Sequence, residues 1–166
     1  VQMAFPISWL RKIADPFGPT YPASGVEKLL TKHFGDKLFK DLHIPTMIVS
    51  YNMSKGCPAI FVSDNEEDGQ HKIKDLCRVS SAAPIYFPPA KLTIGTEEQA
   101  FVDGAVVSNN PVDFATIRYL RDRQEGQRPF MLSLGTGSPN YDLTADEICK
   151  WNMFDWLGNI TRVIFD

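Results

Sequence analysis

Short apolar segments of strand length alternate along this chain with segments whose apolar residues recur at helical spacing. Residues 44–53 and 130–134 are apolar without strict alternation, which is typical of strands buried on both faces. Residues 59–63 and 99–102 are shorter strand candidates, and residues 73–80 lie between them with a helical period. This order predicts an α/β domain built on a largely parallel central sheet.

Other helices are predicted from their start and stop signals. Two S/T-x-x-E patterns, at residues 24–27 and 144–147, predict capping boxes at helix starts. The first of these helices is expected to end at Gly35, and the second is followed by aromatic residues. Asn110 is a suitable N-cap residue and Pro111 fits the first helical position, so another helix is predicted to begin there.

Composition and charge exclude several classes of function. The chain carries 17 basic and 20 acidic residues, and its net charge of -3 gives no electrostatic basis for binding nucleic acid or an anionic membrane surface. Its 166 residues, 43% of them hydrophobic, can form one core, and no apolar run approaches the ~18 residues of a membrane-spanning helix. The three cysteines and three histidines show no metal-ligand spacing, so we expect no metal or other cofactor.

Both ends of the sequence resemble positions inside a longer chain more than natural termini. The sequence starts at Val1 without an initiator methionine or a signal-peptide pattern, and it stops on the apolar run at residues 163–165. We therefore expect this sequence to be part of a longer protein.

Asp103 is the first candidate for chemistry. It follows the strand candidate at residues 99–102 and precedes Gly104, in a segment with few other charges. Functional side chains of α/β sheets gather at the carboxyl ends of strands, where a carboxylate can accept a proton or orient a nucleophile. Asp-Gly is also a common turn, and on position alone the structural role is favoured.

The second candidate is Ser80 and Ser81, near the end of the helix that is predicted to begin at Ile73 and to be stopped by Pro84. Neither lies in the G-x-S-x-G pattern that presents a nucleophilic serine on a strand-to-helix turn, and the sequence contains no such pattern. Both serines are therefore expected to pack against the site or to support it.

The third candidate is Gly135, which begins a Gly-Thr-Gly segment after a predicted strand. Such a segment can cradle a phosphate, but the Gly-Lys-Ser/Thr of a P-loop is absent. A tight turn beside an active site is the preferred interpretation, and an unrelated nucleotide-binding domain is a weaker alternative.

Four ordered motifs together resemble those of the patatin-like phospholipases. They are residues 80–89 (SSAAPIYFPP), 102–105 (VDGA), 108–111 (SNNP) and 132–137 (LSLGTG). The resemblance extends over residues 21–137. It depends on the order of all four motifs, because the Asp-Gly-Ala match alone is not specific.

The resemblance implies a three-layer hydrolase fold with a largely parallel central sheet, of which residues 1–166 form a part. It also implies a lipid acyl hydrolase of the phospholipase A or esterase type, with a Ser-Asp dyad and no catalytic histidine. Asp103 matches the dyad aspartate, and Gly104 and Ala105 complete its motif. Five further residues are implied to support the site or to line its pocket: Ser80, Ser81, Asn109, Asn110 and Gly135.

The same resemblance implies chemistry without a metal or other cofactor. The expected partner is a lipid ester at a membrane or micelle surface. Both a cytoplasmic location and secretion as a bacterial effector are compatible with such a protein.

The sequence departs from the family pattern because it lacks both the serine elbow and the glycine-rich oxyanion loop that precedes it. The loss of two elements from the same end favours truncation, and the missing N-terminal part of the domain is then a further expected partner. These residues alone are expected to be inactive. The alternative is a catalytically inactive module that binds lipid or a protein.

Overall fold

The computed structural model describes residues 18–123, 125–126, 128–135, 137, 143–156 and 159–160. Thr136 of the Gly-Thr-Gly segment and both chain ends lie outside the described residues. By its internal contacts the chain divides into two compact units, Val1–Val107 and Ser108–Asp166.

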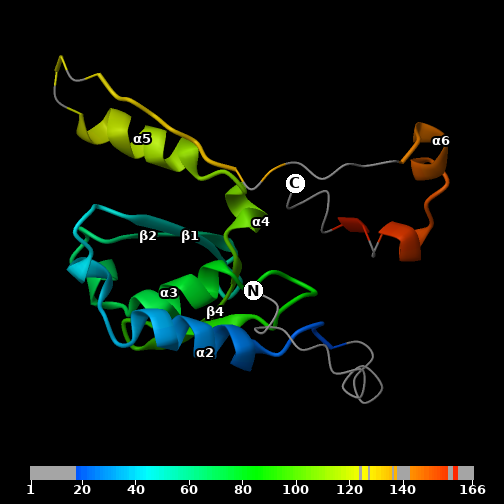
Figure 1. Cartoon of the computed structure of the whole chain (residues 1–166), viewed down its shortest axis with the longest axis horizontal. Helices are drawn as coiled ribbons and strands as arrows, with labels where there is room; N and C mark the ends of the chain where they lie inside the picture. Colours follow the sequence, from blue (N-terminus) through cyan, green and yellow to red (C-terminus); the bar gives the residue numbers. More distant parts are fainter. Residues whose placement is uncertain are drawn as a thin grey trace. The chain divides into compact units, whose positions relative to one another are not determined.

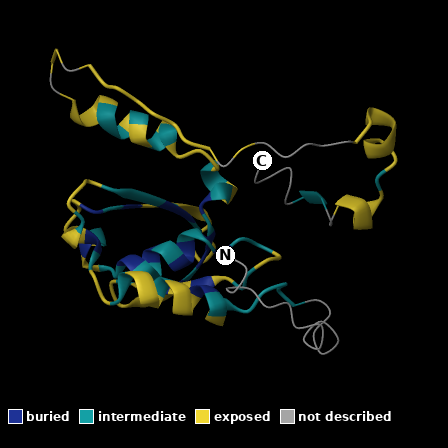
Figure 2. Ribbon diagram, in the orientation of Figure 1, coloured by how far each residue is buried: buried dark blue, intermediate teal, exposed yellow. Residues whose placement is uncertain are grey.

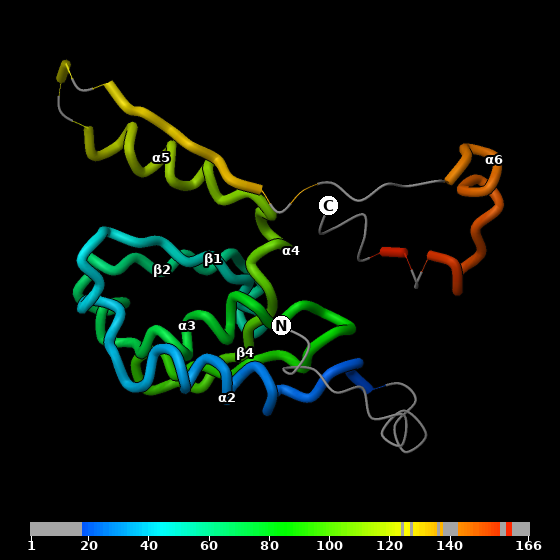
Figure 3. The backbone as a smooth tube through the Cα atoms, viewed as in Figure 1, coloured from blue at the N-terminus to red at the C-terminus, as the bar shows by residue number. Residues whose placement is uncertain are grey.

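The first unit contains a four-stranded sheet with the strand order β2-β1-β4-β3. All three strand pairs are antiparallel. Figure 3 shows β1 and β2 side by side along their length. The strands are β1 (Met47–Asn52), β2 (Cys57–Val62), β3 (Ala90–Ile94) and β4 (Glu97–Asp103).

The prediction of mixed α/β structure is confirmed, but the prediction of parallel pairing is wrong for these strands. The turn at residues 53–56 joins β1 to β2, and Gly95 and Thr96 join β3 to β4. Connections this short permit only antiparallel neighbours, because a parallel pair needs a long crossover. An apolar run without alternation therefore did not indicate strand direction in this part of the chain.

One helix lies against the sheet of the first unit, and a second helix packs on the first (Figure 1). The helix α3 (Ile73–Ser80) packs on β1, β3 and β4, and α2 (Ala23–Phe34) packs on α3. The core consists of buried side chains from the strands, from α3 and from the 3-10 helix at Phe39–Asp41. Figure 2 shows this burial along α3 and the strands, and Leu76 and Phe101 are among the most deeply buried side chains.

The start of α2 differs by two residues from the prediction, which placed the N-cap at Ser24. Pro22 occupies the N-cap position and makes no side-chain capping hydrogen bond, so Ser24 lies inside the helix and the predicted capping box is wrong. The predicted end is confirmed. Gly35 follows the helix at φ 56°, a left-handed conformation that favours glycine, and its N–H donates to the carbonyl of Thr31 at 2.9 Å.

The second unit carries α5 (Val112–Asp122) and α6 (Ala145–Ile148), and the short α4 (Ala105–Ser108) lies at the junction of the two units. Pro111 is the N-cap of α5, one residue later than predicted, and Asn110 Oδ1 accepts a hydrogen bond from the N–H of Val112 at 3.2 Å. The capping box at Thr144 and Glu147 is confirmed.

Residues 130–134 do not form the predicted strand. They are extended and exposed, with Phe130 90% and Leu134 83% accessible. A strand needs a partner for its backbone N–H and C=O groups, and none of the described residues pairs with this segment.

Among the described residues, no helix combines the length and the apolar character that crossing a bilayer requires.

Candidate functional site

Asp103 lies at the carboxyl end of β4, half-buried, directly across from Ser50 of β1. Its Oδ1 accepts a hydrogen bond from the N–H of Ala105 at 2.8 Å, across the intervening Gly104. In the described part of the chain, its other oxygen, Oδ2, has no hydrogen-bond partner. The Asp-Gly turn expected from the sequence therefore forms, and it leaves one carboxylate oxygen available for chemistry.

Burial raises the pKa of Asp103, and the hydrogen bond from the Ala105 N–H opposes this only in part. A raised pKa makes the carboxylate a stronger base than an ordinary aspartate. This is the direction that proton abstraction from a hydroxyl requires.

The raised pKa has a consequence for stability. Above its raised pKa, Asp103 is ionised in the folded protein, in a site that disfavours its charge, whereas the unfolded chain ionises it from the ordinary aspartate value of 3.8. We therefore expect Asp103→Asn to raise the melting temperature at pH 7. The gain should shrink as the pH falls through the raised pKa and should be absent once Asp103 is protonated in both states. Thermal unfolding of both proteins between pH 3 and pH 7 would test this, and a variant that is less stable at pH 7 would contradict it.

Gly104 is buried where the backbone of β4 leaves the sheet and passes close to β1. A Cβ at this position would overlap the carbonyl oxygen of Val49 and would lie 2.8 Å from its carbonyl carbon. The N–H of Gly104 donates to the carbonyl of Ser80 at 3.2 Å. Only glycine fits here without moving backbone, which explains physically why this motif position is glycine.

The structure brings Ser80 next to Asp103 and Gly104. Ser80 is the last residue of α3, and its hydroxyl donates to the carbonyl of Val49 at 2.7 Å. The hydroxyl of Ser81 donates to the carbonyl of Arg78 at 3.4 Å, which is a bond within the end of the same helix. Among the described residues, neither hydroxyl is hydrogen-bonded to the Asp103 carboxylate, and the supporting role of the two serines stays a prediction.

Sequence reasoning missed Ser50, although it lies directly opposite Asp103 in the sheet. Ser50 is fully buried, and its hydroxyl lies 2.7 Å from the carbonyl oxygen of Val102 and 3.2 Å from that of Val79. The available signal was a polar residue inside the apolar run at residues 44–53.

The remaining predicted residues belong to the second unit. Asn109 and Asn110 are exposed and precede α5, and the Asn110 side-chain amide donates to the hydroxyl of Ser133 at 3.0 Å. Gly135 is exposed, and a Cβ there would meet nothing within 4 Å. Asn110 and the segment before Gly135 are therefore held together within this unit.

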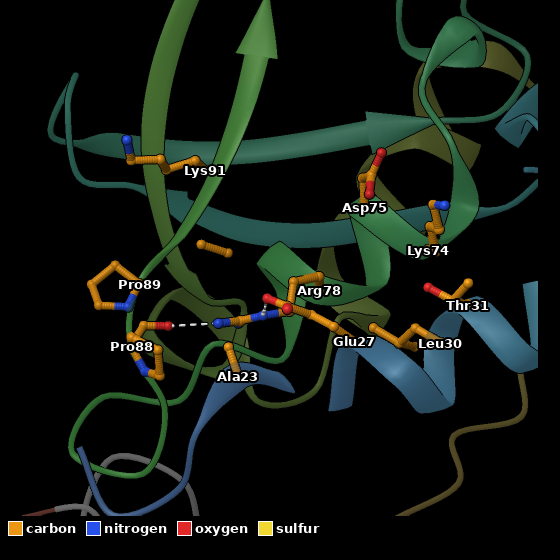
Figure 4. A pocket seen from close by; sticks show the side chains of 11 residues that line it. Ala23, Glu27, Leu30, Thr31, Lys74, Asp75, Arg78, Pro88, Pro89 and Lys91 are labelled. Carbon is orange, nitrogen blue, oxygen red and sulfur yellow. Dashed lines mark hydrogen bonds and ion pairs between the residues drawn. The ribbon is translucent and has the colours of Figure 1, made fainter. Parts of the chain in front are cut away.

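A cavity of about 360 Å³ lies between α2, α3 and the segment that leads into β3 (Figure 4). Arg78 crosses it. Its Nη2 donates to the carbonyl of Pro88 at 2.9 Å, and its Nε lies 3.4 Å from a carboxylate oxygen of Glu27. Asp103 is not among the lining residues. This cavity is therefore separate from the carboxylate, and Arg78 ties the loop at residues 84–89 to the two helices.

Among the described residues, no three His, Cys, Asp or Glu side chains are grouped so that they could hold a metal ion.

Comparison with known proteins gives consistent matches. The model of the family "Patatin-like phospholipase" matches residues 2–116. Patatin-08 of Solanum tuberosum is 29% identical over an alignment 174 positions long, which covers 89% of this chain and 44% of the relative. Patatin-01 of the same plant is 30% identical, with 85% of this chain and 42% of the relative covered. The chain thus spans less than half the length of these curated relatives.

Proposed function

The chain belongs to the patatin-like phospholipase family, and from this premise we propose that it is part of a lipid acyl hydrolase in which Asp103 is the catalytic acid and base. The main observation that supports the proposal is the environment of the Asp103 carboxylate. It lies half-buried at a strand end, its pKa is raised, and one oxygen is fixed by Ala105 while the other has no partner among the described residues.

In the proposed reaction, a serine supplied by residues outside this sequence attacks the ester carbonyl. Oδ2 of Asp103 accepts the hydroxyl proton while the bond from serine oxygen to acyl carbon forms. The bond from acyl carbon to the leaving alcohol then breaks, and Asp103 returns the proton to that alcohol. Water cleaves the acyl-enzyme by the same steps, with Asp103 again accepting and returning a proton.

The residues around Asp103 have supporting roles in this proposal. Gly104 lets the chain pass close to β1, and the N–H of Ala105 holds Oδ1 in place. The carbonyls of Ser80 and Ala82, at and just after the end of α3, accept hydrogen bonds from the N–H groups of Gly104 and Asp103 and so hold the turn in place, while Ser81 stabilises the helix end itself. Asn109, Asn110 and Gly135 belong to the second unit, and their contribution to the pocket stays a prediction from the family resemblance. This chemistry requires no metal or other cofactor.

We further propose that the chain is one part of a larger domain, whose remaining strands provide the three-layer architecture with parallel pairing that the family resemblance implies. The supporting observation is the extended segment at residues 130–134, which exposes Phe130, Leu132 and Leu134 and has no partner strand among the described residues. Strand-forming residues with this much apolar exposure are normally covered.

The proposal is tested by assaying the complete protein, with the natural sequence on both sides of these residues. Fatty acid release from neutral phospholipid vesicles and cleavage of a soluble p-nitrophenyl ester should both be detected, without added metal and in the presence of a chelator. A complete protein that cleaves neither substrate would contradict the proposed activity.

A catalytically inactive module that binds lipid or protein is the second candidate. Two observations favour it: these residues contain no G-x-S-x-G, and Phe154 and Trp156 are 75% and 44% exposed. The two candidates separate in one experiment, because an inactive module would co-sediment with the vesicles and release no fatty acid from them.

A further inference from the structure

Ser50 is a buried polar residue in the strand next to Asp103. Its side chain is fully inaccessible to solvent, and Ser50 and Asp103 are direct partners in the antiparallel register of β1 and β4. Directly opposed residues of an antiparallel pair project to the same face of a sheet, about 4.5–5.5 Å apart at Cβ. Ser50 and Asp103 therefore share the face against which α3 packs.

The hydroxyl of Ser50 joins three segments of the fold. Its Oγ lies 2.7 Å from the carbonyl oxygen of Val102 in β4 and 3.2 Å from that of Val79 in α3. A hydroxyl has one proton, so it donates chiefly to the nearer carbonyl, Val102, and shares that proton with Val79. The residue that it holds most closely is the one that immediately precedes Asp103.

The backbone of Asp103 and Gly104 is bound to the same helix end. The N–H of Asp103 donates to the carbonyl of Ala82 at 3.1 Å, and the N–H of Gly104 donates to the carbonyl of Ser80 at 3.2 Å. Ser80 in turn donates from its hydroxyl to Val49, the neighbour of Ser50. Residues 102–104 are thus held by hydrogen bonds to β1 and to the end of α3, and the Ser50 hydroxyl lies where these three segments meet.

We propose that Ser50 is a positioning residue for Asp103, which fixes the strand end so that the carboxylate keeps one orientation. The proposal rests on the proposed catalytic role of Asp103. Removing the hydroxyl leaves the Val102 and Val79 carbonyls without this donor in a buried site and frees the strand end to shift. A displacement of about 1 Å at a reacting group is enough to cost on the order of 100-fold in rate.

Ser50→Ala in the complete protein is the test, and Ser63→Ala is its matched control. Ser63 is also a buried serine, 6% exposed, and its hydroxyl accepts the N–H of Thr46 at 2.8 Å, at the other end of β1. Ser63→Ala removes a part-buried side-chain hydrogen bond to the backbone, and Ser50→Ala removes the buried hydrogen bond that Val102 and Val79 share. We expect Ser50→Ala to lower kcat for ester cleavage by about 10- to 100-fold with KM changed by less than about twofold. Ser63→Ala should leave kcat unchanged at a similar loss of stability.

Amide hydrogen exchange gives a second measurement that does not depend on activity. In Ser50→Ala, the amides of Asp103 and Gly104 should exchange at least tenfold faster, while those of the β1–β2 hairpin keep their protection. If Ser50→Ala does not fold, Ser50→Cys retains nearly the same side-chain volume with a much weaker donor and should show the same changes.

Two results would overturn the proposal: an unchanged kcat in the folded Ser50 variant, or unchanged exchange at Asp103 and Gly104. A kcat that falls equally in Ser63→Ala would also overturn it, because the effect would then follow stability alone. A wild-type protein without ester hydrolysis would contradict the proposed function instead, and the exchange measurement would still decide the role of Ser50.

Discussion

Replacing Gly104 with alanine is expected to lower the free energy of unfolding by about 2–3 kcal/mol, because the added methyl group has no space. Its Cβ would overlap the carbonyl oxygen of Val49, and that carbonyl belongs to β1 in the centre of the sheet. Backbone yields far less readily than a flexible side chain. The turn must therefore move away from β1, and the hydrogen bond from the Gly104 N–H to Ser80 is strained with it.

Gly56→Ala is the matched control. Gly56 ends the turn between β1 and β2 at φ +66°, and a Cβ there would meet nothing within 4 Å. Its replacement should cost about 1 kcal/mol from backbone strain alone. Denaturant unfolding of the complete protein measures both values. If Gly104→Ala cost no more than Gly56→Ala, the close approach of residue 104 to Val49 would be wrong.

The helices were predictable because their signals are local. The helix predicted from the apolar period that starts at Ile73 is α3. It begins at Ile73 as expected and ends at Ser80, before the Pro84 that was expected to stop it, and Gly35 follows α2 as expected. The N-cap of α2 was placed two residues late. The Ser24 pattern suggested a capping box that does not form, and Pro22, which has no side-chain acceptor, occupies the N-cap position.

The strands were less predictable because their pairing depends on distant residues. Strand β3 was missed, although polar Lys91 and Thr93 alternate with buried Ala90 and Leu92, as is typical of a strand with one solvated face. Residues 130–134 have strand composition, but composition does not supply a partner strand.

The candidate site was predictable only in part. The order of four motifs selected Asp103, whose position at the end of β4 agrees with the strand-end location expected from the sequence. Ser50 was not found, because its importance arises from a contact with Val102, 52 positions later in the chain. No local pattern distinguishes such a serine from an ordinary polar residue in a strand.

The largest expected effect is on activity. Asp103→Asn should reduce kcat/KM for ester hydrolysis by the complete protein by about 10³-fold or more, because an amide cannot accept the serine proton. Asparagine keeps the size of the side chain and retains an oxygen for the N–H of Ala105. The structure of the turn should therefore survive, and the loss should be chemical in origin.

The control is Asp64→Asn, the same replacement at an exposed residue in the turn that follows β2, which should retain the activity of the wild-type protein. Circular dichroism and thermal unfolding establish that all three proteins are folded before they are compared.

The decisive measurement is kcat/KM of the complete wild-type, Asp103→Asn and Asp64→Asn proteins on one soluble ester at pH 7. The assignment of Asp103 as catalytic acid and base predicts a loss of about 10³-fold or more in Asp103→Asn alone. Turnover within a few-fold of the wild-type protein in folded Asp103→Asn would contradict it.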